Sequence, residues 1–219
     1  MCGTLLQPYI GHKSDFCTHS WGRRRPFMVY GTIATIICIN SLSWTSETVM
    51  FIHKIFYGPL PSRSSEVAIQ ILAVSWVWAL NIAIQPVQAG IRALIVDSCP
   101  ASQAVQANSF ASSAVIVGSA LGYACAFLKM PVWLENSQFK GLCLIASISL
   151  GTTVGVTSIM VEEKPPENGN LDLRGLSVLN IWTDIYRTAR GLPPIIKKVC
   201  LIQFFSWLAW FPFLFNIVM

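Results

Sequence analysis

Charged residues are scarce in this sequence, and five long stretches contain none. Asp, Glu, Lys and Arg make up 11% of the 219 residues, hydrophobic residues make up 53%, and the mean hydropathy is +0.56. Soluble domains carry about 25% charged residues, so this composition excludes an ordinary soluble domain. The uncharged stretches are 26–46, 67–91, 98–128, 141–161 and 199–219.

The length of these stretches matches the thickness of a membrane. Each contains at least 21 residues, and a helix of that length covers roughly 30 Å, the thickness of the hydrocarbon layer. A large soluble protein with buried core helices is the alternative, but five such runs in succession argue against it. We therefore predict an all-α, multi-pass integral membrane protein with about five complete transmembrane helices. The apolar first ten residues lack a basic leader and a cleavage site, so we interpret them as the end of a further helix rather than a signal peptide.

Signatures of metal, disulfide and enzyme chemistry are also missing. The seven cysteines include no CxxC pair, and the spacing of His12, Cys17 and His19 fits no metal motif. All three histidines lie between the predicted spans, which contain no HExxH, no paired aspartates and no Ser/His pair. We therefore expect neither an enzyme nor a bound metal or cofactor.

The distribution of Lys and Arg predicts which loops face the cytoplasm. Ten of the fifteen basic residues fall in 11–25, 97–107 and 162–198, whereas 47–66 and 129–140 hold four. Because cytoplasmic loops are enriched in Lys and Arg, the first set is predicted to lie inside. This asymmetry accounts for most of the net charge of +5, so we expect no nucleic-acid partner. The segment 162–198 opens with EEKPPENGNLD and is interpreted as a cytoplasmic linker.

The strongest local motif lies in the first cytoplasmic loop, where WGRRRPF follows Gly11, Ser14 and Asp15. Three arginines at this boundary can serve topology and contact with anionic lipids. Topology needs neither glycine nor aspartate, however. The pattern therefore also predicts a tight turn whose Asp15 carboxylate pairs with an arginine or caps a helix N-terminus, which makes a latch that can open.

A second polar set lies within the predicted helix 67–97. Asn81, Gln85, Gln88 and Arg92 follow one another at steps of four, three and four residues, which keeps them on one helical face. A central arginine costs about 2.5–3.5 kcal/mol in lipid, so this face should contact other helices or water. Three alternatives remain open: the face lines a cavity, the amides form interhelical hydrogen bonds, or Arg92 extends toward the inner interface and pairs with Asp97.

Both motifs resemble those of the major facilitator superfamily. Its loop between helices 2 and 3 carries G-x-x-x-D-R-x-G-R-R, and the longer form seen here resembles the sucrose transporter branch of the glycoside/cation symporter group, with Phe16 in place of the usual arginine. The segment VQAGIRALIVD is similar to the fourth helix of these symporters, in which the arginine is linked to substrate or proton coupling. Arg92 and Asp97 match that helix. The family's aspartate eleven positions earlier is Asn81 here, and an amide cannot carry a coupling proton.

The resemblance extends over nearly the whole chain and implies a fold and a function. It implies a partial major facilitator fold, running from the end of helix 2 to helix 7 of a fungal sucrose or α-glucoside/proton symporter. Such carriers have two six-helix halves that rock around a central site. The implied divisions are an incomplete N-terminal half at 1–161, the linker at 162–198, and the first helix of the C-terminal half at 199–219.

The implied partners are the lipid bilayer and a small glycoside such as sucrose or maltose, with the proton as the coupling ion and no cofactor. The plasma membrane is favoured over the vacuole. We expect the isolated polypeptide not to transport, because most of the second half is missing from these residues; a transporter-derived sensor or scaffold without flux is the alternative. The predicted pathway residues are Asn81, Gln85, Gln88 and Arg92. The predicted latch residues are Gly11, Asp15, Gly22, Arg23, Arg24, Arg25 and Asp97.

Overall fold

The computed structural model describes residues 2–15, 17, 21–57, 63–100, 102–127, 138–161, 163, 187 and 190–218. Within these residues the regular structure is helical. The helices are α1 (Cys2–Asp15), α2 (Arg25–Ser43), α3 (Thr45–Tyr57), α4 (Arg63–Ser98), α5 (Ala104–Phe127), α6 (Gln138–Met160) and α8 (Pro194–Val218). The chain divides into two compact units, Met1–Leu171 and Asp172–Met219.

Four helices in the described residues are long and apolar enough to cross a membrane. They are α2, most of α4 (Glu66–Ser98), most of α5 (Ala104–Cys125) and α6. This confirms the prediction of an all-α, multi-pass membrane protein. The predicted fifth span, 199–219, falls in the 25-residue helix α8; it is not among the four, so its membrane crossing stays a prediction. The predicted divisions at 161/162 and 198/199 also stay predictions.

The helix ends differ from the edges of the uncharged stretches. Helix α2 ends at Ser43, where the Trp44 N–H donates to the Asn40 and Leu42 carbonyls. Helix α3 then occupies most of 47–66, which the sequence predicts to be a loop between spans, and α4 is 36 residues long. The reason is physical: the absence of charge marks the hydrocarbon boundary, whereas a helix can continue beyond that boundary into water.

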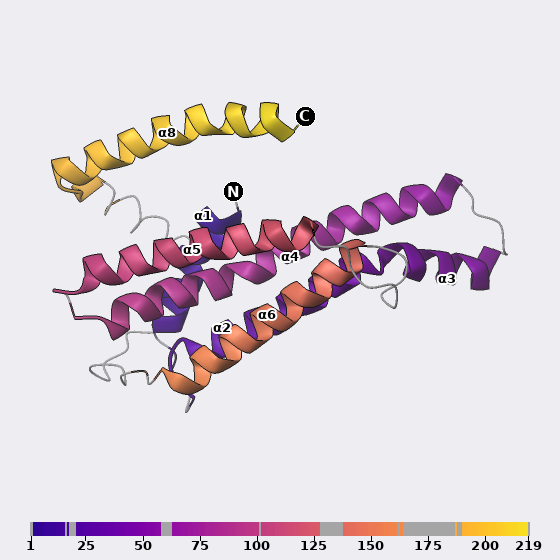
Figure 1. Ribbon diagram of the computed structural model, residues 1–219, viewed down its shortest axis with the longest axis horizontal. Coiled ribbons are helices and arrows are strands. Elements are labelled where there is room, and N and C mark those ends of the chain that lie inside the picture. Colours follow the sequence, from indigo (N-terminus) through magenta and orange to yellow (C-terminus); the bar gives the residue numbers. More distant parts are fainter. Residues whose placement is uncertain are drawn as a thin grey trace. The chain divides into compact units, whose positions relative to one another are not determined.

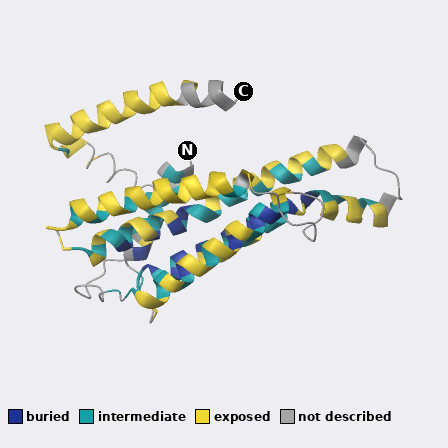
Figure 2. Cartoon of the chain, in the orientation of Figure 1, coloured by how far each residue is buried: buried dark blue, intermediate teal, exposed yellow. Residues whose placement is uncertain are grey.

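Helix α2 is central to the first unit because it packs against both α4 and α6, while α1 and α3 pack against α4 (Figure 1). Buried hydrophobic side chains are few. Met28, Val87, Leu94 and Val154 form the small core between these helices. Most other apolar side chains are exposed, as the largely yellow helices of Figure 2 show. Such surfaces are expected where lipid or further helices replace water.

Two glycines allow α2 and α4 to approach closely. A Cβ atom at Gly31 would lie 3.0 Å from both Pro86 Cβ and Val87 Cγ2. A Cβ atom at Gly90 would overlap the Cγ of Met28, which is fully buried. Small residues at such positions bring membrane helices into van der Waals contact. This contact fixes the position of α4, which carries the polar face.

The second unit contains α8. Its described side chains are exposed and largely apolar, and the rings of Phe204 and Phe205 meet edge to face, with centroids 5.7 Å apart. The Lys197 amine donates to the Arg190 carbonyl at the start of the helix, at 2.9 Å. Because α8 begins after Pro193, with Pro194 as its first residue, its start follows the preference of proline for the first helical turn.

Candidate cytoplasmic latch and polar face

The three arginines of the first loop stand at the N-terminus of α2. Arg25 is the first residue of the helix and Pro26 the second, a position that suits proline because its missing N–H would have no helical partner. Gly22 precedes them with φ +120°, a backbone conformation that favours glycine. This turn directs the free N–H groups of the first helical turn toward the end of α6.

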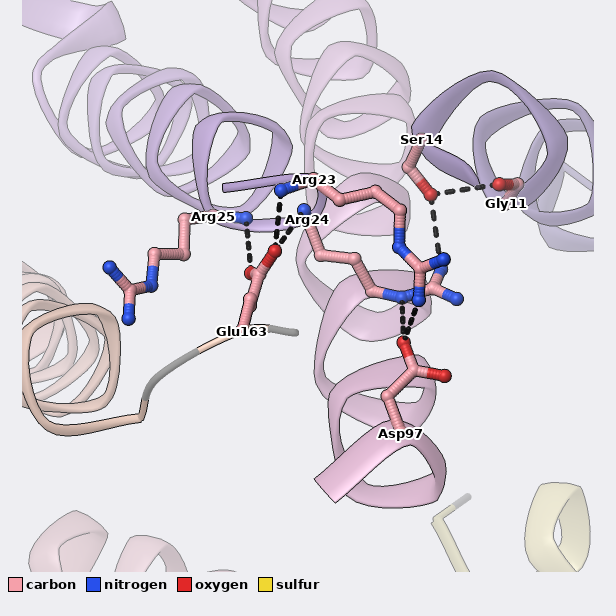
Figure 3. A network of polar contacts seen from close by, with 7 residues as sticks. All are labelled: Gly11, Ser14, Arg23, Arg24, Arg25, Asp97 and Glu163. Carbon is pink, nitrogen blue, oxygen red and sulfur yellow. Dashed lines mark hydrogen bonds and ion pairs between the residues drawn. The ribbon is translucent and has the colours of Figure 1, made fainter. Parts of the chain in front are cut away.

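Glu163, just beyond α6, caps these N–H groups. Its Oε2 accepts hydrogen bonds from the backbone N–H of Arg23 at 2.5 Å and of Arg24 at 2.9 Å, and its Oε1 accepts from the N–H of Arg25 at 2.9 Å (Figure 3). A Cβ atom at Gly22 would lie 2.8 Å from Glu163 Oε2, so the glycine also gives the carboxylate room. A negative charge here is favourable because the N-terminus of a helix is electropositive.

Asp97, at the C-terminal end of α4, accepts from two of the arginines. Its Oδ2 receives Arg24 Nε at 2.6 Å and Arg23 Nη2 at 2.7 Å. The Arg24 side chain is only 9% exposed, so its charge needs this counter-charge. The structure thus brings together the predicted latch residues Arg23, Arg24 and Asp97.

Helix α1 joins the same network through Ser14. Arg24 Nη1 donates to Ser14 Oγ at 3.1 Å, and the Ser14 hydroxyl donates to the Gly11 carbonyl at 2.8 Å. Gly11 therefore takes part through its backbone. The Asp15 backbone ends α1, but its side chain lies outside the described residues, so its predicted pairing stays a prediction.

Arg25 points in a different direction from the other two arginines (Figure 3). Its Nη2 donates to the Val161 carbonyl at the end of α6, and its Nη1 donates to the Trp21 carbonyl at 3.5 Å. A cation at this place is favourable because the C-terminus of a helix carries partial negative charge.

On the predicted polar face of α4, one residue is buried against α1 and the other three are exposed. Gln85 is buried, and its Oε1 accepts from Gln7 of α1 at 2.9 Å; Gln7 also donates to Gln88 at 3.4 Å. Asn81 and Arg92 are exposed. The Asn81 amide donates to the Val77 carbonyl of its own helix at 2.8 Å. Among the described residues Arg92 forms no ion pair, and Asp97 receives Arg23 and Arg24 instead.

Sequence reasoning missed Glu163 and Gln7. Glu163 had an available signal: it follows an uncharged run on the side of the membrane that holds the three arginines. Gln7 gave a weaker signal, because it is a single amide in a stretch interpreted as the end of a helix. On α5 the hydroxyls of Ser113 and Ser119 donate to carbonyls of their own helix.

An ion pair joins the first turn of α3 to the first turn of α6, away from the arginines. Lys140 Nζ pairs with Glu47 and lies 5.8 Å from the centre of the Trp44 ring. The hydrogen bond from Lys140 lowers the pKa of Glu47 from its ordinary range, although Glu47 is half exposed. No cluster of three or more His, Cys, Asp and Glu side chains suited to a metal occurs among the described residues.

Comparison with known proteins identifies relatives of the chain. The general alpha-glucoside permease of Schizosaccharomyces pombe is 33% identical over 226 residues, which cover 99% of the chain and 39% of the permease. Sucrose transport protein SUT5 of Oryza sativa subsp. indica is 26% identical, over 98% of the chain and 42% of its own length. The chain is a homologue of α-glucoside and sucrose permeases. Sucrose transport protein SUC4 of Arabidopsis thaliana, 27% identical over 98% of the chain, is a further relative.

The chain spans about two fifths of the length of these relatives. No protein-family profile matches it, and no solved structure matches it. The relatives carry the names of transporters, in agreement with the prediction that the chain is not an enzyme.

Proposed function

We propose that this chain forms part of a proton-coupled carrier for α-glucosides such as sucrose or maltose. The observation that carries the proposal is the polar face of α4 in a chain whose relatives are α-glucoside and sucrose permeases. Asn81, Gln88 and Arg92 are exposed on a membrane-spanning helix. Because a charged side chain is costly in lipid, this face needs water, substrate or further helices. Amide and guanidinium groups are the donors that sugar hydroxyls require.

The proposal assigns separate tasks to the residues of this face. Arg92 and Gln88 bind the glycoside, while Gln85 is held by Gln7 and positions α4 against α1. Asn81 has no titratable group, so the coupling proton is carried at another position of the carrier. The latch of Arg23, Arg24 and Asp97 closes the cytoplasmic side. The plasma membrane is the proposed location.

The 219 residues by themselves are proposed not to carry flux. Helix α5 is exposed along almost its entire length, and so are Arg92 and Gln88. A pathway needs walls on all sides, and these surfaces require partner helices from the rest of a carrier. A sensor that binds a glycoside without transporting it is the second candidate, and the replacement at Asn81 is the observation that favours it.

Uptake of labelled sucrose and maltose in transport-deficient yeast tests the proposal. One strain expresses the chain alone, and another expresses the fission-yeast permease with its matching segment replaced by this chain. We expect accumulation by the chimera, sensitive to an uncoupler, and none by the chain alone. Arg92→Ala should lower uptake by the chimera at least tenfold, with Arg92→Lys less affected and Ser113→Ala as a matched control.

Each outcome bears on one part of the proposal. A chimera that reaches the membrane but accumulates no sugar contradicts the carrier role, and saturable sugar binding by that chimera would support the sensor. Accumulation by the 219-residue chain contradicts its proposed inactivity. Uptake unaffected by the uncoupler contradicts proton coupling.

A further inference from the structure

Helix α6 runs antiparallel to α2 and to the start of α3, which follows α2 in the chain. From α2, Arg25 Nη2 donates to the Val161 carbonyl and Asn40 Nδ2 donates to Ser147 Oγ at 3.0 Å; from α3, Glu47 pairs with Lys140. In each pair the two residue numbers add up to 186 or 187. The three contacts therefore share one register, which runs from the end of α6 back to its first turn.

At the cytoplasmic end the two helices cap each other. The carboxylate of Glu163, beyond the end of α6, accepts three backbone N–H groups at the start of α2, and the guanidinium of Arg25, in the first turn of α2, donates to the Val161 carbonyl just after α6. Each group is of the sign that the neighbouring helix end favours.

This exchange determines where the three arginine side chains are directed. Glu163 engages the backbone of Arg23 and Arg24 and leaves their guanidinium groups available. Both guanidinium groups then reach a single oxygen of Asp97, at 2.6 and 2.7 Å (Figure 3). Two cations on one oxygen demand a fixed backbone, since a shift of the turn would separate at least one of them.

We infer that Glu163 is the positioning residue of the latch: it fixes the backbone from which Arg23 and Arg24 reach Asp97, and it does so through hydrogen bonds to backbone N–H groups and not to Asp97. Its carboxylate acts through the backbone at the start of α2. In a carrier this couples the end of α6 to closure of the cytoplasmic side, and only that last step rests on the proposed function.

Hydrogen exchange of the purified 219-residue chain in detergent, followed by mass spectrometry, tests the role without sugar or flux. In Glu163→Ala we expect the amides of residues 23–25 to exchange about tenfold faster or more, because three hydrogen bonds to a carboxylate are lost. Exchange in the last turn of α4, residues 94–98, should also rise. Glu163→Gln keeps one acceptor oxygen of two, so its effect should be intermediate.

Two further variants distinguish positioning from general destabilisation. Asp97→Asn should raise exchange at 94–98 while 23–25 stay protected, because Glu163 still caps them. Glu66→Ala, which removes an exposed carboxylate from the first turn of α4, should change neither segment. The middle of α2, residues 32–40, reports on overall folding in every variant.

Three results would overturn the role of Glu163. The first is unchanged exchange at 23–25 in both Glu163 variants. The second is a rise at 32–40 in step with 23–25, which would mean that the helix as a whole is destabilised. The third is a rise at 23–25 without any change at 94–98, which would leave Glu163 a helix cap with no influence on the latch. A failure of sugar uptake by the yeast chimera would leave all three readings unaffected.

Discussion

The contact between α2 and α4 allows a sharp test of the packing. A Cβ atom at Gly90 would overlap Met28 Cγ and lie 3.1 Å from its Sδ, whereas a Cβ atom at Gly118 would meet nothing within 4 Å. Both glycines lie in helix interiors. Replacing either with alanine therefore gains the same helix propensity, about 1 kcal/mol.

The two substitutions differ in packing alone. Overpacking a closely packed site costs about 1–3 kcal/mol, and Met28 is fully buried, so its side chain cannot move aside into solvent. Gly118→Ala should therefore stabilise the chain by up to about 1 kcal/mol. Gly90→Ala should be less stable than Gly118→Ala by about 1–3 kcal/mol.

Thermal unfolding of the purified chain in detergent, followed by circular dichroism, measures this difference. For a chain of this size 1 kcal/mol corresponds to about 2–4 °C in Tm. Met28→Ala alone should cost about 2–5 kcal/mol because it leaves a cavity. Combined with Gly90→Ala it should cost less than the sum of the two single changes, because the new methyl group enters that cavity.

Two results would refute this reasoning. One is a Tm for Gly90→Ala as high as that for Gly118→Ala, which would mean that Met28 moves aside freely. The other is strict additivity of Gly90→Ala and Met28→Ala, which would mean that the two positions are not in contact.

Two more predictions follow from single contacts. Gln7→Leu should destabilise the chain by about 1–3 kcal/mol because it leaves the buried Gln85 Oε1 without its donor; a Tm equal to that of the unaltered chain would contradict this. The ion pair of Glu47 and Lys140 should contribute stability at pH 7 that is lost as the pH falls below 4.5 through the lowered pKa of Glu47. The contribution is below about 1 kcal/mol because Glu47 is half exposed, and Lys140→Met should abolish that part of the pH dependence of Tm.

Much of the fold follows from the sequence because hydrocarbon imposes a simple rule. Charged groups are excluded from it, so the uncharged runs of this chain mark four helices that the structure describes. The same rule says little about helix ends. Helix α3 continues to Tyr57 beyond the hydrocarbon, where water tolerates helix and loop alike.

For the candidate site, the sequence predicted several of the residues but not which of them pair. The arginines and Asp97 were evident from the sequence because ionic groups at the edges of membrane helices are rare. That Asp97 receives both Arg23 and Arg24 was not, because nothing in the composition links residues so far apart along the chain.

The sequence by itself determined that this chain is a membrane protein, which four described helices are long and apolar enough to cross the bilayer, and which polar side chains had to find partners, because these follow from the free energy of placing charge in lipid. Only the tertiary structure decided which partners they found. Asp97 and Glu163 lie more than 70 and more than 130 residues from the arginines along the chain. Their approach depends on the packing of α2 against α4 and α6, which glycines at the first contact and a constant register at the second make possible.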